Sequence, residues 1–339
     1  MEELRGRLFD GKYRLVRMIG EGGMGTVYDA EHTRIARRVA LKVLHEELNH
    51  DAEAVGRFIR EAQAASSLGH PNIIEIFDVG QEDDGTAFMV MELLGGQDLG
   101  TQMSLEGAIS PARALGIAVQ VLSALHEVHR QGIVHRDMKP ENVFLTIDEK
   151  AREVVKLLDF GIAKLPTPAQ SADQLSRTRT GVVLGTPYYL APEAARGRRD
   201  VDHRVDLWSV GVILYEMLSG LRPFEGENYN EILSAILLEA PRPIGEVAPH
   251  LPPRLDEILG RALAKHPDDR YASAGEMLGD LLPLCDERVE MNSPVRLQLA
   301  RHETSPDRGP LRAEPPIRRG ARTTSPSGWL LNSDIPDAV

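Results

Sequence analysis

The chain of 339 residues contains a single cysteine, Cys285. One thiol cannot form an internal disulfide, which excludes a disulfide-stabilised scaffold and fits a reducing compartment. Long apolar runs are also missing. The best candidate, "VGVILYEML" from Val210 to Leu218, contains Glu216 and is shorter than the roughly 18 residues of a membrane span. The N-terminal stretch "MEELRGRLFDGKYRL" has no apolar signal core. We therefore expect a cytoplasmic protein without a membrane anchor.

A basic surplus is absent as well, because 51 acidic residues outnumber 39 lysines and arginines and give a net charge of −12. This balance argues against nucleic acid as a partner. Hydrophobic residues make up 42% of the chain and charged residues 27%, as is typical of a globular protein. The length suffices for one large or two ordinary domains.

The composition changes at the C-terminal end. Residues 286–339 hold seven prolines and three Ser-Pro steps, and their eight arginines balance eight acidic residues. We expect a disordered tail over 285–339, rich in proline, arginine and serine. Its Ser-Pro steps are either modification or docking sites, or parts of a featureless linker.

The hydrophobic periodicity divides the remaining chain into two parts. Alternating apolar residues predict strands over 13–45, followed by a helix over 51–68, where the spacing becomes helical. Two more strands are expected within 72–94. Beyond Ser110, helical patterns dominate, and the first of these helices should end at Gly132. The pattern predicts a small sheet-rich lobe and a larger helical lobe.

Against this background the stretch "IGEGGMGTVY" is rich in glycine. Gly20, Gly22 and Gly25 form a GxGxxG frame, with Val27 two residues further on. Such a stretch can be a flexible hairpin tip, or a loop whose backbone approaches a phosphate closely. This segment alone leaves both readings open.

Lys42 lies in the apolar strand "VALKVL", where a charge is costly unless it is paired. Glu61, on the predicted helix, could form that ion pair and aim the ammonium at a nucleotide. Alternatively, Lys42 extends to the surface and Glu61 is solvated.

Two polar segments add the chemistry of phosphate transfer. In "HRDMKPEN", Asp137 could accept a proton from an attacking hydroxyl, Lys139 could neutralise a phosphoryl group, and Asn142 offers an amide oxygen to Mg²⁺. Asp159, in "LLDFG", could bridge Mg²⁺ to phosphates. The alternative of two ordinary polar loops does not account for the joint spacing.

The ordered set GxGxxGxV, VALK, HRDxKxxN, DFG and APE resembles the protein kinase family. "GEGGMGTVY" and "GTPYYLAPE" are most similar to bacterial eukaryotic-like (Hanks-type) serine/threonine kinases. The resemblance covers residues 13–284 and implies an α+β, bilobal fold. In this fold, an antiparallel-sheet N-lobe with one main helix spans about 13–94, and a mostly helical C-lobe spans about 97–284.

The resemblance also implies ATP and Mg²⁺, or Mn²⁺ in its place, with transfer of the γ-phosphoryl group to Ser/Thr hydroxyls of protein substrates. Lys139 and Thr186 resemble the serine/threonine branch rather than the tyrosine branch.

The same resemblance implies a nucleotide site under the glycine loop. Ile19 and Val27 would bracket the adenine, Met91 would be the gatekeeper, and Asp98 would reach the ribose. Lys42 would contact the α- and β-phosphates. The implied nucleotide-binding residues are Ile19, Gly20, Glu21, Gly22, Gly23, Met24, Gly25, Thr26, Val27, Ala40, Lys42, Met91, Glu92, Leu94 and Asp98.

For catalysis, the resemblance implies that Asp137 is the base and that Lys139 contacts the γ-phosphate. Asn142 and Asp159 would be metal ligands, with Lys42 and Glu61 as the supporting ion pair.

Further residues would have structural roles. His135 would be a structural prop, and Asp206 would anchor the catalytic loop. A buried pair would join Glu193 to Arg270. The main departure from the family is Asp29, which stands where relatives often have a basic residue and should slightly change the strand surface.

Regulation should act through the segment between Asp159 and Glu193. Thr178 and Thr180 lie where relatives autophosphorylate, within a transient homodimer, and Arg136 could hold the phosphate. Alternatively, they are ordinary loop threonines.

Two other functions stay open: an ATP-binding pseudokinase scaffold, which degraded motifs would indicate, and a small-molecule phosphotransferase, which would lack the APE segment.

Overall fold

The computed structural model describes residues 4–159, 187–198 and 200–285. Several predictions lie outside these residues: those for the tail, for Thr178, Thr180 and Thr186, and for the two residues after Asp159. Within the described ranges, no helix is both long and apolar enough to cross a bilayer.

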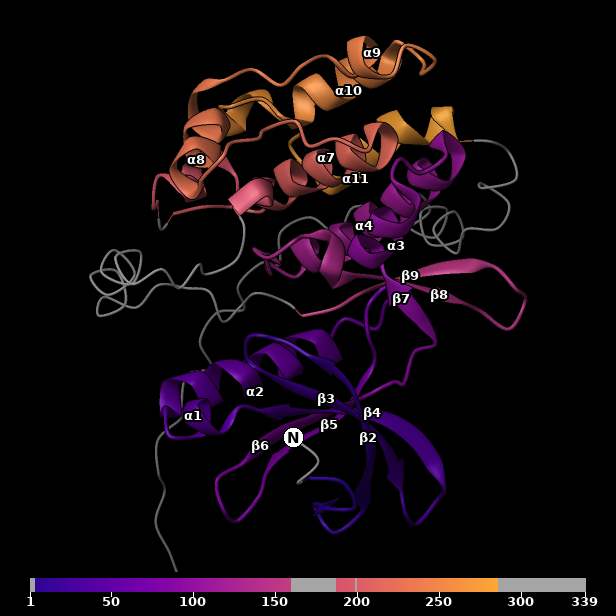
Figure 1. Ribbon diagram of the computed structural model, residues 1–339, viewed down its shortest axis with the longest axis vertical. Coiled ribbons are helices and arrows are strands. Elements are labelled where there is room, and N and C mark those ends of the chain that lie inside the picture. Colours follow the sequence, from indigo (N-terminus) through magenta and orange to yellow (C-terminus); the bar gives the residue numbers. More distant parts are fainter. Residues whose placement is uncertain (1–3, 160–186, 199, 286–339) are drawn as a thin grey trace, which may run out of the picture. The chain divides into compact units, whose positions relative to one another are not determined.

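The N-terminal lobe is built on a six-stranded antiparallel sheet in the order β1-β2-β3-β4-β6-β5 (Figure 1). Its strands are β1 (Leu8–Phe9), β2 (Tyr13–Glu21), β3 (Gly25–His32), β4 (Arg37–Leu44), β5 (Ile76–Gln81) and β6 (Ala87–Met91). Two helices accompany the sheet, the short α1 (Glu46–Asn49) and the longer α2 (Ala52–Ser66). The predicted sheet with one main helix is therefore confirmed.

Helix α2 covers one face of this sheet. Asp51 caps its N-terminus by accepting hydrogen bonds from the backbone of Glu53 and Ala54. Its apolar stripe, which includes Phe58 and Ala62, packs on side chains of β4 and β6. The helix ends two residues before the predicted boundary, and Gly69 follows with a φ of +35°.

A second sheet, of three strands, lies between the N-terminal sheet and the helices of the other lobe (Figure 1). It consists of β7 (Gly96–Asp98), β8 (Val143–Ile147) and β9 (Glu153–Leu157) in the order β7-β8-β9. The main helices of the lobe are α3 (Leu99–Glu106), α4 (Pro111–Arg130), α7 (Arg204–Ser219), α8 (Tyr229–Leu238), α10 (Arg254–Ala262) and α11 (Ala274–Leu281). Among its described residues, the lobe also has two single-turn α-helices, α6 (Pro192–Ala195) and α9 (Ile244–Val247).

Helix α7 forms the centre of this lobe. Every residue from Val205 to Leu218 is buried, because the helix is apolar nearly all round and is surrounded by protein. Helix α4 packs against α7 and α11. As predicted, α4 begins at Pro111 and is followed by Gly132, whose φ of +74° lets the chain leave the helix. Ser110 occupies the N-cap position without a capping side-chain bond.

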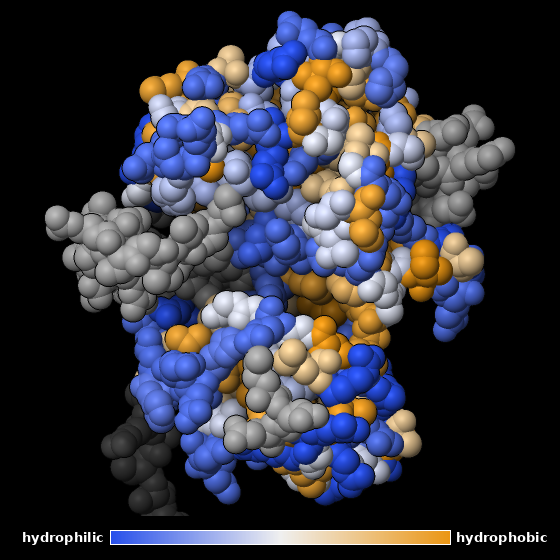
Figure 2. Space-filling view, in the orientation of Figure 1, coloured by the Kyte–Doolittle hydropathy of each residue, from blue (hydrophilic) through white to orange (hydrophobic). Residues whose placement is uncertain are grey.

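Apolar side chains are collected in these cores. On the face shown in Figure 2, hydrophilic residues cover most of the described surface and apolar residues occur in patches. The large apolar side chains that remain exposed include Ile35, Leu105, Ile147 and Leu238.

Asp29 differs from its expected place on the strand surface. It is only 1% exposed, because the guanidinium groups of Arg17 and Arg38 lie against its carboxylate. Arg38 Nε donates to Asp29 Oδ1 at 2.9 Å. The departure is thus a buried carboxylate covered by two exposed arginines.

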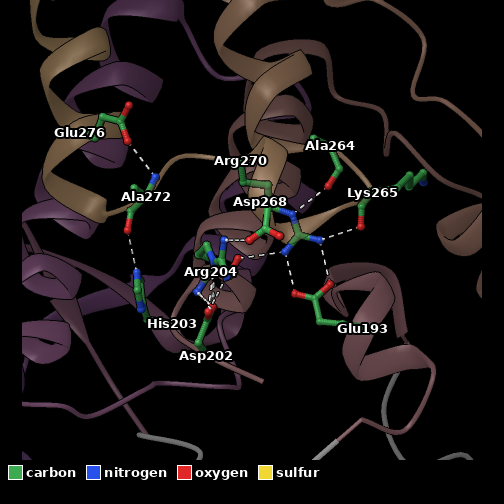
Figure 3. Close-up of polar contacts among 10 residues, drawn as sticks. All are labelled: Glu193, Asp202, His203, Arg204, Ala264, Lys265, Asp268, Arg270, Ala272 and Glu276. Carbon is green, nitrogen blue, oxygen red and sulfur yellow. Dashed lines mark hydrogen bonds and ion pairs between the residues drawn. The ribbon is translucent and has the colours of Figure 1, made fainter. Parts of the chain in front are cut away.

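Glu193 and Arg270 form the predicted buried pair (Figure 3). Two guanidinium nitrogens of Arg270 donate to the two carboxylate oxygens of Glu193 at 2.7 and 2.8 Å. Arg270 also donates to the backbone carbonyls of Ala264, Lys265 and Arg204. The bidentate pair joins α6 to the segments that surround the start of α7.

We predict that Arg270→Met lowers the free energy of unfolding by about 3–5 kcal/mol, because Glu193 would keep a buried charge without its partner. As the control, Arg261→Met removes the exposed pair with Glu276 and should cost about 1 kcal/mol or less. Adding Glu193→Gln to Arg270→Met should recover part of the loss. Denaturant titration measures all three, and equal losses for the two arginine variants would contradict the prediction.

Candidate active site

The glycine-rich segment is the tip of the hairpin between β2 and β3. The backbone N–H of Gly22 donates to the carbonyl of Gly25 at 2.9 Å and closes the turn. A Cβ on Gly25 would lie 2.2 Å from the carbonyl oxygen of Val43, so this glycine is required by the chain's own packing. A Cβ on Gly20 or Gly23 would meet open space. The two readings are therefore compatible: the segment is a hairpin tip, and it also leaves room for a ligand.

Lys42 projects from β4 in the midst of apolar side chains. It is paired across the sheet with Val27 and Met89 and is 7% exposed. Its ammonium donates to Asp159 Oδ1 at 2.6 Å. Burial acts to lower the pKa of Lys42, but the charges of Asp159 and Glu61 outweigh it and raise the pKa above its ordinary value. Lys42 therefore remains a cation inside the lobe.

The observed partner of Lys42 differs from the partner that the sequence predicts. The direct ion pair joins Lys42 to Asp159 rather than to Glu61, which is 6% exposed and acts on Lys42 through its charge. Two carboxylates compete for one ammonium, and the chain turn after β9 brings Asp159 into contact. At this turn the backbone φ of Asp159 is +41°, a left-handed conformation uncommon for a residue other than glycine.

Asp159 is also affected by this contact. Desolvation acts to raise its pKa, yet the charge and hydrogen bond of Lys42 hold the pKa below its usual range. The backbone N–H of Leu158, the preceding residue, donates to the carbonyl of Asn142 at 2.9 Å. The segments that carry Asp159 and Asn142 are thus joined directly.

Asp206 holds the first residues of the catalytic loop, which is the segment 135–142 that contains the predicted base. Its two carboxylate oxygens accept the backbone N–H groups of His135 and Arg136, each at 2.8 Å. His129 Nε2 lies 2.8 Å from the same carboxylate. Arg136 has a φ of +63°, a costly conformation for a side-chain-bearing residue, which these bonds help to maintain. The predicted anchor is confirmed.

His135 lies inside the loop with no solvent exposure. Its Nε2 lies 3.1 Å from the carbonyl of Leu158, which can only accept, so Nε2 carries the proton. Its Nδ1 accepts from the backbone N–H of Asp137 at 3.4 Å. Burial lowers the pKa of His135, so the ring stays neutral. These contacts agree with the predicted structural role of His135, in which its ring supports the backbone around it.

The loop brings together two of the predicted catalytic side chains, Asp137 and Lys139, and the predicted metal ligand Asn142. Asn142 Nδ2 lies 2.6 Å from the carbonyl oxygen of Asp137 and 3.3 Å from its Oδ2. Lys139 Nζ lies 3.5 Å from the same carboxylate. Because the Asn142 amide donates to Asp137, its oxygen Oδ1 is the atom that could face a cation.

The predicted adenine contacts belong mostly to one apolar cluster. Val27, Ala40, Met91 and Leu94 pack in it together with Leu158. Ile19 lies on β2 and is 40% exposed, so it borders the site rather than the core. The cluster therefore includes Val27, the cross-strand partner of Lys42.

The segment that connects the lobes, from Glu92 to Asp98, makes contacts that the sequence did not indicate. The Glu92 carboxylate accepts from Lys156 Nζ at 2.6 Å and from the backbone of Glu75 at 2.9 Å. Asp98 caps α3, because its carboxylate accepts from the backbone and hydroxyl of Thr101 at 2.8 and 2.7 Å. A ribose contact by Asp98 would share its carboxylate with this cap. The polar residue just before a helix was the available signal for Asp98, whereas no local pattern marks the pairing of Lys156 with Glu92.

The donor set fits a nucleotide with a hard cation. Open space lies next to Gly20 and Gly23, and Lys42 supplies a buried positive charge. Asn142 and Asp159 offer the oxygen ligands that Mg²⁺ prefers. Among the described residues, no group of three or more His, Cys, Asp or Glu side chains could hold a metal by itself.

A family model described as protein kinase domain matches residues 13–280. The chain belongs to the protein kinase family. The kinase fold also appears in the solved kinase domain of Mycobacterium tuberculosis PknI, which is 33% identical and superposes with a TM-score of 0.62. That match covers 82% of this chain and 96% of the PknI chain.

Relatives of this chain include two bacterial proteins. The serine/threonine-protein kinase pkn3 of Myxococcus xanthus is 43% identical over 87% of this chain and 54% of its own length. The serine/threonine-protein kinase PknA of Mycobacterium tuberculosis is 39% identical over 80% of this chain and 60% of its own length. The chain thus spans about half the length of these curated relatives.

We predict that Gly25→Ala lowers the free energy of unfolding by about 1–3 kcal/mol, because the new methyl group would displace the backbone at Val43. Gly23→Ala is the matched control, since its methyl group meets open space, and should change stability by about 0.5 kcal/mol or less. Thermal and denaturant unfolding of both variants checks this. Equal effects would mean that the close approach does not constrain the hairpin.

Proposed function

We propose that this chain is a serine/threonine protein kinase that transfers the γ-phosphoryl group of ATP to Ser/Thr hydroxyls of proteins. The observation that carries the proposal is the joint placement of Lys42 against Asp159 and of Asp137 against Asn142 and Lys139. Phosphoryl transfer needs positive charges for the phosphates, two ligands for a metal ion and a base for the attacking hydroxyl. These residues can supply all three.

Each side chain has a defined task in this proposal. Lys42 binds the α- and β-phosphates, and Glu61 helps to keep it charged. Mg²⁺, or Mn²⁺ in its place, neutralises developing charge when bound, and Asn142 with Asp159 would hold it. Asp137 orients the incoming hydroxyl and accepts its proton, while Lys139 contacts the γ-phosphate.

The nucleotide's other end would lie on the apolar cluster. Backbone groups of Glu92 and Leu94 contact the adenine edge beside the gatekeeper Met91, and Asp98 reaches the ribose. The remaining residues of this proposed site are Ile19, Gly20, Glu21, Gly22, Gly23, Met24, Gly25, Thr26, Val27 and Ala40. The proposed kinase domain runs over 13–284.

The choice of serine and threonine rests on two supports. Lys139 follows Asp137 by two residues, as in that branch of the family, and the relatives pkn3 and PknA are named serine/threonine-protein kinases. We further propose that the protein acts in the cytoplasm and has no nucleic-acid partner, because of its single cysteine and its acidic charge.

Replacing Asp137 by asparagine should reduce phosphate transfer by about 10²–10⁴-fold, because the base is lost while the site keeps its shape. Phosphate incorporation into the protein and into a generic basic protein, measured by mass spectrometry with Mg-ATP, checks this. Asp83→Asn, in the exposed turn between β5 and β6, is the control and should act as the wild type. If wild-type protein binds ATP but transfers no phosphate, the pseudokinase alternative holds.

We also propose that Thr178 or Thr180 is phosphorylated, by transfer within a transient homodimer, and that Arg136 holds the phosphate. The double replacement by alanine should lower the rate at least about tenfold, since one charge-assisted hydrogen bond contributes about 1.5 kcal/mol. Thr33→Ala, in the turn between β3 and β4, should leave the rate unchanged. Phosphatase treatment of the wild type should reproduce the loss, and an unchanged rate in the double variant would reject the proposal.

A further inference from the structure

His45, the residue that follows β4, makes two hydrogen bonds to the tip of the glycine hairpin. Its imidazole Nε2 lies 2.8 Å from the carbonyl oxygen of Gly22. Its backbone N–H donates to the carbonyl of Met24 at 2.9 Å. The two bonds hold the hairpin tip on either side of Gly23, from a residue outside the hairpin.

We propose that His45 is a positioning residue for nucleotide binding, which fixes the tip of the glycine loop in the place where it covers the phosphates. The inference rests on the proposed kinase function and adds a residue that neither the sequence motifs nor the family resemblance assigns.

Besides His45, two contacts fix the tip: the turn bond from Gly22 to Gly25, and the side chain of Met24, which packs on the apolar cluster of the lobe. The last cross-strand partners of β2 and β3 are Glu21 and Thr26, so residues 22–24 extend beyond the ladder. Glycine backbone is the most flexible in the chain, and a Cβ at Gly23 would meet nothing within 4 Å. Without attachment, the tip would have to be ordered when a ligand binds, and this ordering lowers affinity.

The chemistry of the bond identifies the required group. A carbonyl oxygen only accepts, so His45 Nε2 must be the donor to Gly22. The donor lies three bonds from Cβ, a spacing that the side-chain amide nitrogen of glutamine reproduces. Asparagine places its amide one bond nearer to the backbone, at the level of Nδ1, and cannot reach.

The position in the sheet explains why this bond matters to phosphates. Lys42, which we propose contacts them, lies three residues before His45 at the end of the same strand, opposite Val27. Gly25 is paired with Leu44, directly before His45. The strand end therefore places the phosphate-binding ammonium and the attachment of the phosphate-covering loop in one fixed relation.

The experiment compares His45→Ala, His45→Asn and His45→Gln in the full chain. Calorimetry gives the Kd of Mg-ATP and of adenosine, which lacks phosphates, and steady-state assays give KM for ATP and kcat. We expect alanine and asparagine to weaken Mg-ATP binding about threefold to tenfold, as for loss of one hydrogen bond, with adenosine binding unchanged. KM for ATP should rise by a similar factor, with kcat within twofold. Glutamine should restore wild-type values.

Two controls separate this role from general folding effects. His45 also stands at the N-cap of α1, where asparagine is a favourable residue, so a loss in His45→Asn cannot come from a weakened helix start. His50→Ala, at the exposed end of the same helix, should bind Mg-ATP as the wild type does.

The inference is overturned if His45→Ala and His45→Asn bind Mg-ATP like the wild type, or if adenosine affinity falls as much as that of Mg-ATP. The second result would indicate a change in the whole lobe rather than at the loop. Failure of the wild type itself to bind Mg-ATP would instead refute the proposed function, and the inference with it.

Discussion

The carboxylate of Asp206 is the contact on which the rest of the site depends. Asp206 is 1% exposed on α7, whose residues from Val205 to Leu218 are all buried, and accepts the successive backbone N–H groups of His135 and Arg136. These bonds hold Arg136 in a left-handed conformation and set the direction of the chain just before Asp137. Because α7 is packed on all sides, the loop with the proposed base is attached to the rigid centre of its lobe. A precise site needs this kind of support from rigid elements.

The second constraint is the ion pair between Lys42, on β4, and Asp159, which follows β9. It links the two sheets. Lys42 and Asp159 are 117 residues apart in the chain, yet their charged groups lie 2.6 Å apart. Lys42 is only 7% exposed and would be costly beside apolar side chains without this partner, and the pKa of each group is shifted toward its charged form. The charge of Glu61 also acts on Lys42. A single ammonium therefore has two carboxylates within its influence, and the choice between them depends on the turn after β9.

Around these charges, the flexible parts are attached from neighbouring elements. The hairpin tip is bound by His45 at the end of β4, and the connector by the bond from Lys156 on β9 to Glu92. Both attachments come from residues at strand ends, where the backbone is already ordered. The site thus combines a loop with open space at its glycines and scaffolding that limits its motion, which favours binding of a ligand without a large ordering cost.

The sequence by itself determined the elements and the order of the motifs. Alternation, helical spacing and capping residues depend on near neighbours, so the strands, α2 and α4 could be predicted to within a few residues. The pairing of Glu193 with Arg270 and the anchor at Asp206 followed from family resemblance. Only the tertiary structure decided that Lys42 contacts Asp159, that Asp29 is buried under two arginines, and that His45 holds the glycine loop. Burial and long-range pairing depend on which strands and turns meet in space, and local periodicity carries no information about that.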